Sequence, residues 1–251
     1  MGSKRDVLFT TYDGRKIYPR SDNQETFISE ALNNDITFCV GPAGTGKSYM
    51  AVALAVSALV NKDVHKIVLC RPAVTAGEKL GFLPGALEEK IAPYLTPLYD
   101  ALYDLLPRED VEDYFKRGRI ELAPLAFMRG RSIKDSFMIL DEAQNTTPAQ
   151  MRMFLTRMDR GSRIIVSGDL SQSDLGRGHT SGLDEAWDVL KNVTGIGFAE
   201  MGSGDIVRHP TVKKIVLAYE EYDEEYEEGQ LDVYEEEYDN LDYDEDEYYE
   251  E

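Results

Sequence analysis

The chain has 251 residues and a formal net charge of −20, from 47 acidic against 27 basic side chains. Nineteen of the acidic residues lie in 219–251, which contains no Lys or Arg, so residues 1–218 carry 28 acidic and 27 basic side chains. An evenly acidic protein would be excluded as a nucleic-acid binder, because it would repel the phosphates. Here the nearly neutral remainder keeps nucleic acid among the possible partners.

The composition excludes several other classes of protein. Cys39 and Cys70 both lie in apolar runs and are too few for a disulfide framework or a metal-ligand set, so we expect them in the core of a protein from the reducing cytosol. No run of about 18 apolar residues is present, which predicts no membrane span. We therefore expect a cytoplasmic protein, of a bacterium or of a host cell if the source is a virus.

Short apolar runs alternate with helical patterns along most of the chain. A turn is expected at 12–15, followed by a helix at 25–32 that Ser21 or Asp22 caps. The β-rich runs predict strands at 36–40, 66–70, 120–123, 137–140, 163–167 and 196–200. Helical spacing predicts further helices at 47–60, 85–106, 148–158, 183–190 and 211–219, the second of them broken or kinked at Pro93 and Pro97.

This alternation predicts an α/β fold with three layers. Buried strands separated by helices indicate a mostly parallel sheet that helices cover on both faces. Residues 75–131 interrupt the rhythm, and we interpret them as an insertion or subdomain at the sheet edge. We thus divide the chain into an N-terminal extension (1–20), an α/β domain (21–219) and an acidic, Tyr-rich tail (220–251).

The strongest local motif follows the first predicted strand. Residues 41–48 fit the phosphate-binding pattern G-x-x-x-x-G-K-[ST] and precede a predicted helix, as this motif requires. Glycines let the backbone wrap the phosphates, the helix dipole adds positive potential, Lys47 supplies a positive charge, and Ser48 supplies a hydroxyl ligand for Mg²⁺. The expected ATP-binding residues are Gly41, Pro42, Ala43, Gly44, Thr45, Gly46, Lys47 and Ser48.

Two later strands end in polar residues that suit the same site. Asp141 and Glu142 follow the strand at 137–140, where ligands of open α/β sheets collect. We expect Asp141 to hold Mg²⁺ and Glu142 to act as the general base toward water. Gln172, just beyond the strand at 163–167, is expected to sense the γ-phosphate or merely to cap a turn.

Several stretches are long and unusual, among them GPAGTGKS, RPAV, LGFLPG, PLAFMRGR, ILDEAQNTTPAQM and DIVRHP. On these motifs, residues 23–220 resemble PhoH-type ATPases, which have one nucleoside-triphosphatase core per chain, similar to the core of superfamily 1 helicases. The resemblance implies a RecA-like, helicase-type P-loop NTPase fold and ATP hydrolysis. It further implies single-stranded RNA or DNA as a partner and a homo-oligomer, with a hexameric ring as a natural closed form.

The resemblance also implies roles for individual residues. Gln24 matches the glutamine that contacts adenine, and Arg71 matches the start of a nucleic-acid-contacting motif. Arg208 matches the arginine finger on the γ-phosphate, acting within its own chain or on a neighbouring subunit, and Arg177 is a second candidate for that role. Gly176 departs from the family pattern, which has proline there.

A basic cluster gives a candidate nucleic-acid surface. Arg129, Arg131 and Lys134 lie near Phe127, and such combinations bind single strands by backbone tracking and base stacking. Lys79 lies on a loop that can join the same groove. The alternative is that these residues form an ordinary solvated face.

Three functions are compatible with these residues. The first is an Mg²⁺-dependent ATPase coupled to binding, unwinding or remodelling of RNA or DNA. The second is a nucleotide-dependent regulatory switch that acts through a protein partner, although Glu142 argues against it because a switch does not need a placed base. The third is a small-molecule kinase, with 75–131 as its lid, which Asp141, Glu142 and Gln172 disfavour.

The acidic tail allows two interpretations. Its composition predicts disorder, because it cannot neutralise its own charge. Either it is a solvated tail that keeps the protein soluble, or its carboxylates and eight tyrosines in 219–251 mimic a nucleic acid and compete for a basic groove.

Overall fold

The structure is a computed structural model that describes residues 5–72, 87–170, 172, 180–207, 211, 212, 214, 215, 217–219 and 222. The chain divides into two compact units, residues 1–207 and 208–251. Every described residue of the second unit is helical, in agreement with the helix expected at 211–219. The expected disorder of the tail falls almost wholly outside the described residues, and the domain boundaries drawn above remain predictions.

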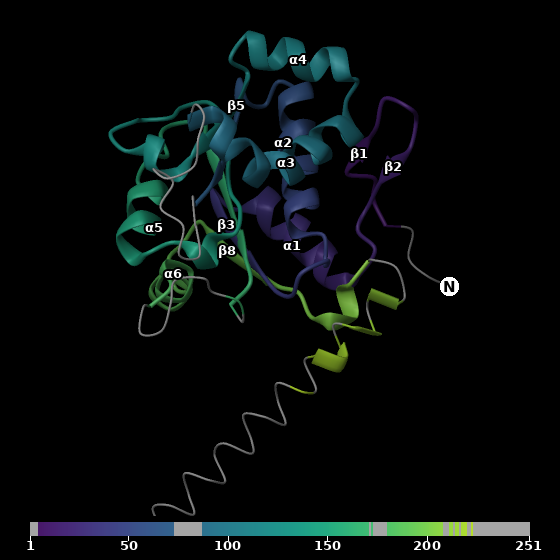
Figure 1. Cartoon of the computed structure of the whole chain (residues 1–251), viewed down its shortest axis with the longest axis vertical. Helices are drawn as coiled ribbons and strands as arrows, with labels where there is room; N and C mark the ends of the chain where they lie inside the picture. The colour runs from purple at the N-terminus through teal and green to yellow at the C-terminus, as the bar shows by residue number, and fades with distance from the viewer. Residues whose placement is uncertain are drawn as a thin grey trace, which may run out of the picture. The chain divides into compact units, whose positions relative to one another are not determined.

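A six-stranded parallel sheet forms the centre of the first unit (Figure 1). Its strands follow the spatial order β5-β4-β6-β7-β3-β8. Their bounds are β3 (Ile36–Val40), β4 (Lys66–Arg71), β5 (Ile120–Pro124), β6 (Ser136–Leu140), β7 (Arg163–Gly168) and β8 (Ile196–Glu200). Each lies within one residue of its predicted bounds, so the predicted sheet is confirmed.

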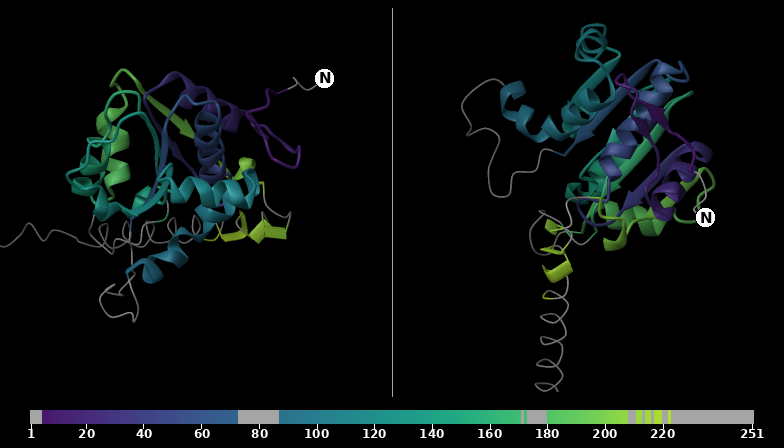
Figure 2. Two further views of the ribbon diagram at one scale, coloured as in Figure 1. Left: turned by 90° about the horizontal axis from the view of Figure 1, so that it is seen from above. Right: turned by 90° about the vertical axis from the view of Figure 1, so that its right-hand side faces the viewer.

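Helices cover both faces of this sheet, as a parallel sheet with near-continuous apolar strands requires. The first layer holds α1 (Asp22–Asn33), α2 (Lys47–Val60), α3 (Leu87–Leu105) and α4 (Arg108–Lys116). The second holds α5 (Pro148–Leu155) and α6 (Gly182–Leu190). Figure 2, seen from above, shows α6 and the α1–α2 pair on opposite sides of the strands. The P-loop NTPase fold class predicted from the sequence is thereby confirmed.

Alternation along the strands divides the core between the two layers. In β6, Phe137 and Ile139 pack with the α1–α4 layer, whereas Met138 and Leu140 pack with the α5–α6 layer. Successive strand side chains point to opposite faces, so one apolar run contributes to both halves of the core. Each fully buried side chain of this size stabilises the fold by about 1.5–3 kcal/mol.

The segment predicted as an insertion is only partly described, and its described part belongs to the main domain. It supplies β5, which extends the sheet at its edge beside β4. In α3, Leu98, Leu102 and Leu105 are fully buried against the core that α2 shares. The described part of this segment therefore lies at the sheet edge as expected and packs on the main core, which favours an insertion over a subdomain.

Two local predictions in this segment also need correction. The helix α3 continues through its prolines to Leu105, so the expected break is wrong and the kink stays a prediction; buried leucines hold its C-terminal half in place. The helix α4 was not predicted at all. Val111 is buried, and Tyr114 and Phe115 pack partly buried against the same core, so the helical stripe was present in the sequence and was overlooked.

A small hairpin precedes α1. Its strands β1 (Phe9–Thr10) and β2 (Lys16–Ile17) pair antiparallel around the expected turn, in which Gly14 has a φ of 85°. Glycine takes this left-handed conformation without a steric penalty. Ile17 is buried in the α1–α4 core, so the hairpin is attached to the first unit rather than being a loose extension.

Strand order then determines which loops meet. Because β7 lies between β3 and β6, the loops after these three strands leave the same carboxyl edge side by side. These are the loops that carry residues 41–48, Asp141 with Glu142, and Asp169 with Gln172.

Candidate functional site

The loop at 41–46 is a backbone cradle that requires its glycines. Gly44 and Gly46 have φ values of 87° and 88°, which disfavour other residues. At Gly41, with φ 144°, a Cβ atom would lie 2.2 Å from the carbonyl oxygen of Met201. The loop is also tied to the following chain, because Val207 N donates to Gly44 O at 3.1 Å. These contacts give the loop the shape that wraps a phosphate.

Lys47 begins α2 and points back over this loop. Its Nζ donates to the carbonyl oxygens of Gly41 and Pro42, the latter at 2.8 Å. The side chain is buried, and burial lowers the pKa of Lys47 from its ordinary value, against the attraction of nearby acids led by Asp169. A buried ammonium with only carbonyl partners is suited to phosphate oxygens, which would compensate its desolvation.

The residues expected to hold Mg²⁺ converge from two loops. Ser48 Oγ donates to Asp141 Oδ1 at 2.7 Å, although 93 residues separate them. The same oxygen accepts from Ser167 Oγ of β7 at 2.8 Å, and Asp141 is 2% exposed. A hydroxyl and a carboxylate beside a phosphate cradle are the oxygen ligands that Mg²⁺ takes in nucleotide sites, so these residues fit the ion.

Arg71 lies at the candidate metal site, and its contact with nucleic acid stays a prediction. Its guanidinium lies against Asp141, with Nε donating to Oδ2 at 2.9 Å and Nη2 to the same oxygen. Nη2 also lies 3.6 Å from Glu142 Oε1. The reason is topological, because β4 is the neighbour of β6 and the two strands end at the same edge.

Glu142 stands beside this metal site with its carboxylate accessible. Its side chain is 46% exposed, in contrast to Asp141, so solvent can reach it. Its backbone φ of 55° is left-handed, a conformation that costs a non-glycine residue free energy and often marks functional sites. Gln144, which sequence reasoning missed, donates from Nε2 to Glu142 Oε2 at 2.8 Å. The only sequence signal was its position two residues beyond Glu142.

Gln172 is described but its predicted role is not tested. Its backbone N donates to Asp169 O at 3.3 Å and its side chain is exposed. The turn contact agrees with the capping alternative, and sensing of the γ-phosphate stays a prediction. Arg177 and Arg208, the two candidates for the finger, lie outside the described residues.

Gln24 supports the loop from below. The residue is 2% exposed, its Nε2 donates to Thr45 O at 2.8 Å, and its Oε1 accepts from Arg20 N at 2.7 Å. Gln24 therefore connects the chain before α1, at Arg20, to the loop, at Thr45. Its contact with adenine stays a prediction.

A cavity of about 400 Å³ opens beside Gly46 and Gln24. The β1–β2 hairpin and the ends of α1, α2 and α3 enclose it, and its other lining side chains include Arg15, Tyr18, Arg20, Tyr49 and Asp104. Tyr49 donates from its hydroxyl to Asp104 Oδ2 at 2.7 Å, and Arg15 pairs with the same carboxylate at 2.6 Å. Sequence reasoning missed these residues because three separate segments supply them.

The candidate nucleic-acid residues divide into two kinds. Phe127 is 54% exposed at the end of η2 (Leu125–Met128), and Arg129 is exposed beside it. Arg131 makes a bidentate ion pair with Glu121 at 2.6 and 2.8 Å, and its contact with nucleic acid stays a prediction. Lys79 lies outside the described residues.

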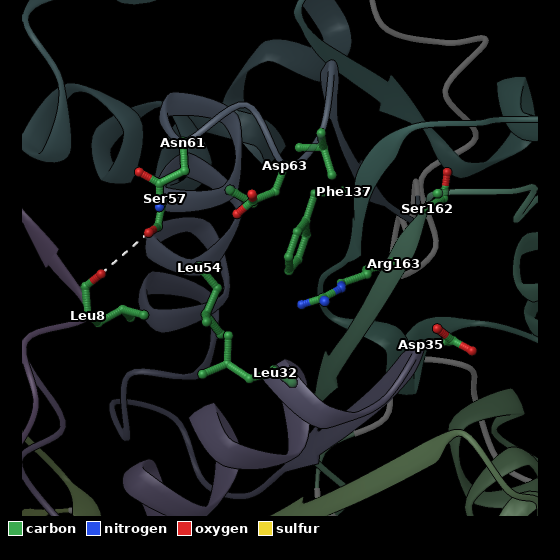
Figure 3. Close-up of a pocket in the computed structure, with 14 residues that line it drawn as sticks. Leu8, Leu32, Asp35, Leu54, Ser57, Asn61, Asp63, Phe137, Ser162 and Arg163 are labelled. Carbon is green, nitrogen blue, oxygen red and sulfur yellow. Dashed lines mark hydrogen bonds between the residues drawn. The ribbon is translucent and has the colours of Figure 1, made fainter.

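A second cavity, of about 420 Å³, lies at the opposite edge of the sheet (Figure 3). Phe137 and Arg163 line it from the amino ends of β6 and β7, and Leu54 and Ser57 line it from α2. It contains none of the residues assigned above. In parallel α/β sheets ligands collect at the carboxyl ends of strands, so this cavity is not the candidate nucleotide site.

The described residues contain neither a membrane-spanning helix nor a cluster of metal ligands. No described helix combines the length and the apolar character that a bilayer crossing needs. No group of three or more His, Cys, Asp or Glu side chains that could hold a metal occurs in the described part either. The second finding is compatible with Mg²⁺, which is commonly bound by one or two protein groups together with substrate phosphates.

Comparison with known proteins gives a consistent family. Residues 16–220 match the family model described as PhoH-like protein. A PhoH-like protein of Bacillus subtilis is 54% identical over 207 residues, which cover 82% of this chain and 65% of that protein. A PhoH-like protein of Synechocystis is 50% identical over 217 residues, covering 86% and 66%. Protein PhoH of Escherichia coli K12 is 40% identical over 209 residues, covering 82% and 59%.

The chain thus spans about two thirds or less of the length of these relatives. Among solved structures, the Sulfolobus solfataricus SWI2/SNF2 ATPase core in complex with dsDNA matches with a TM-score of 0.46 and 13% identity, covering 79% of this chain and 47% of that one. The UvsW helicase of bacteriophage T4 matches with a TM-score of 0.45 and 14% identity, covering 78% and 64%.

Proposed function

The chain belongs to the family of PhoH-like proteins, and on that premise we propose that it is an Mg²⁺-dependent ATPase whose turnover is coupled to single-stranded RNA or DNA. One observation carries the proposal. Ser48 and Asp141, 93 residues apart in the chain, meet at 2.7 Å beside the Lys47 ammonium and the accessible Glu142 carboxylate. This set can hold a triphosphate, a divalent ion and an attacking water together.

The phosphate end of ATP would lie in the cradle of residues 41–46. Lys47 would exchange its two carbonyl partners for β- and γ-phosphate oxygens, a stronger, charge-assisted contact. Ser48 and Asp141 would hold Mg²⁺, which supplies charge neutralisation between the β- and γ-phosphates when it is bound. The adenine would lie in the cavity beside Gly46, where it can stack on the rings of Tyr18 or Tyr49.

Hydrolysis then needs a proton acceptor and an oriented water. Glu142 takes a proton from the water while the water oxygen forms a bond to the γ-phosphorus. The bond from that phosphorus to the β–γ bridging oxygen breaks, so the products are ADP and inorganic phosphate. The finger would be Arg208 or Arg177. A finger supplied by a neighbouring subunit is the reason to expect a homo-oligomer; the alternative is that the chain's own end supplies it.

Nucleic acid would contact the exposed pair of Phe127 and Arg129. An aromatic ring beside a guanidinium offers stacking to a base and a charge to a phosphate, without sequence preference. Such binding weakens as salt rises, because counterions are released.

The test is ATP turnover by phosphate release, with and without saturating single-stranded RNA or DNA, alongside a particle mass from light scattering. We expect Mg²⁺-dependent turnover that a single strand stimulates. Lys47→Ala should abolish it. Glu142→Gln should retain binding of a non-hydrolysable analogue but lose about 10²–10⁴ in rate.

The outcomes separate the alternatives. Turnover that neither RNA nor DNA changes would remove the nucleic-acid coupling. Slow hydrolysis with a protein complex that forms only with ATP would favour the regulatory switch. A Glu142→Gln protein with normal turnover would remove Glu142 from the mechanism.

A further inference from the structure

Gln144 has no part in the chemistry above, yet it is built into the site. It lies in η3 (Ala143–Asn145), directly after the two acids, and is 5% exposed. Its amide uses both ends: Nε2 donates to Glu142 Oε2 at 2.8 Å, and Oε1 accepts from Asp169 N at 3.1 Å. One side chain therefore joins the candidate base to the end of β7.

The backbone around Gln144 is shaped for this contact. A Cβ atom at Gly168 would lie 2.8 Å from Gln144 Oε1 and 2.5 Å from a methyl group of Leu183. Only glycine allows the amide and α6 to approach the end of β7 this closely. Glu142 itself is held in the left-handed region, which directs its side chain in a way that ordinary backbone angles would not.

The connection from β7 to α6 is tied to the same segment at its far end. Ser181 caps α6 by accepting from Leu183 N, and its hydroxyl donates to the carbonyl oxygen of Gln144 at 2.9 Å. Gly182 N donates to Thr146 O at 2.7 Å. The segment 142–147 thus contacts the chain directly after β7, at Asp169, and the start of α6, at Ser181 and Gly182.

We propose that Gln144 is a positioning residue that orients the Glu142 carboxylate and links that orientation to the backbone of Asp169, directly after β7. The inference rests on the proposed ATPase function and deepens it. Oε2 accepts from the amide, and Oε1, which lies 3.6 Å from Arg71 Nη2, is the oxygen that would accept a proton from water. Water can solvate the exposed carboxylate, but it does not hold the carboxylate in one orientation as a buried amide fixed at its other end does.

The test separates the two contacts of the amide. Gln144→Glu keeps an acceptor for Asp169 N but replaces the donor toward Glu142 with a repelling oxygen. Gln144→Met keeps the length and removes both contacts. Gln150→Glu is the matched control, because it adds the same charge at a helix position where Glu also completes a capping box with Thr147.

We expect Gln144→Glu to lower kcat roughly 10–100-fold, the usual effect of losing an outer-sphere partner. Binding of a non-hydrolysable ATP analogue should stay within about twofold, so that kcat changes and binding does not. Gln144→Met should also lower kcat while leaving binding of the ATP analogue within about twofold, even if its thermal stability falls. Gln150→Glu should match the wild type in both measurements.

A double-substitution cycle shows whether Gln144 acts through Glu142. In a Glu142→Gln background, Gln144→Glu should change the residual rate by less than about twofold, because the group it orients has gone. The same 10–100-fold loss in both backgrounds, or a Gln144→Glu protein with wild-type kcat, would overturn the proposal. A wild-type protein without turnover would refute the ATPase function itself, and this inference with it.

Discussion

Replacing Arg71 with methionine would remove one member of a buried ion pair. Asp141 is 2% exposed and the Arg71 side chain is 13% exposed, so water cannot readily take over when the partner is lost. Breaking such a pair from one side costs about 3–5 kcal/mol, because an uncompensated charge stays buried. Ser48 and Ser167 continue to donate to Asp141 Oδ1, so we expect the lower end, about 3 kcal/mol.

Urea unfolding followed by circular dichroism, in EDTA and without nucleotide, measures this loss directly. Thermal unfolding under the same conditions gives a second measure. For a domain of this size the melting temperature falls about 2–4 °C per kcal/mol, so a loss of about 3 kcal/mol predicts a decrease of about 6–12 °C. Arg108→Met is the matched control, because Arg108 is 79% exposed and pairs with Glu112 one helical turn away. We expect that control to lose only about 0.3–0.5 kcal/mol.

A double-substitution cycle with Asp141→Asn tests the cause. If the ion pair is responsible, Arg71→Met should cost much less in the Asp141→Asn background, where no buried charge is left alone. A loss below about 1 kcal/mol for Arg71→Met, the range of an exposed pair, would refute the reasoning. Equal losses in the two backgrounds would assign the effect to packing of the arginine stem instead.

Three further predictions test other parts of the structure. Gly41→Ala should destabilise the fold by more than about 1 kcal/mol, because its Cβ would meet Met201 O at 2.2 Å. The control is Gly202→Ala, whose Cβ would have nothing within 4 Å, and it should change the free energy of unfolding by less than about 0.5 kcal/mol. The hydrogen bond from Arg131, helped by Lys66, lowers the pKa of Glu121 from 4.5 to about 2. The resulting stability is present above pH 4.5 and is lost as the pH falls toward 2, so urea unfolding of Glu121→Gln should show a flatter pH profile in that window, and an unchanged slope would contradict the assignment. Arg129→Ala should weaken single-strand binding in fluorescence anisotropy and reduce the salt slope by about 1, whereas an unchanged slope would exclude a phosphate contact.

The sequence by itself predicted the parts of this protein that local chemistry determines. The loop at 41–48 could be assigned because its glycines, lysine and serine are contiguous and stand between an apolar run and a helical run. Strand bounds followed from apolar runs for the same reason, since a strand buried on both faces needs little beyond its own residues to be recognised. The helix predicted from residue 148 begins at Pro148, because Thr147 and Gln150 form a capping box that spans only four residues.

Packing decided the elements on which local signals conflict. Proline disfavours the interior of a helix, yet α3 runs through its prolines because its later leucines are buried in a shared core. By contrast, α4 has a local pattern in Val111, Tyr114 and Phe115, which pack against the same core.

Partner choice among polar side chains depended on the tertiary structure alone. Arg71 and Asp141 are 70 residues apart, and they meet only because β4 lies next to β6 in the sheet. Glu121 similarly pairs with Arg131, and Gln144 reaches Asp169 only because β7 ends beside η3. Residue types state what a side chain is able to bind. The order of strands, which no local pattern encodes, decides which of those partners comes within hydrogen-bonding distance.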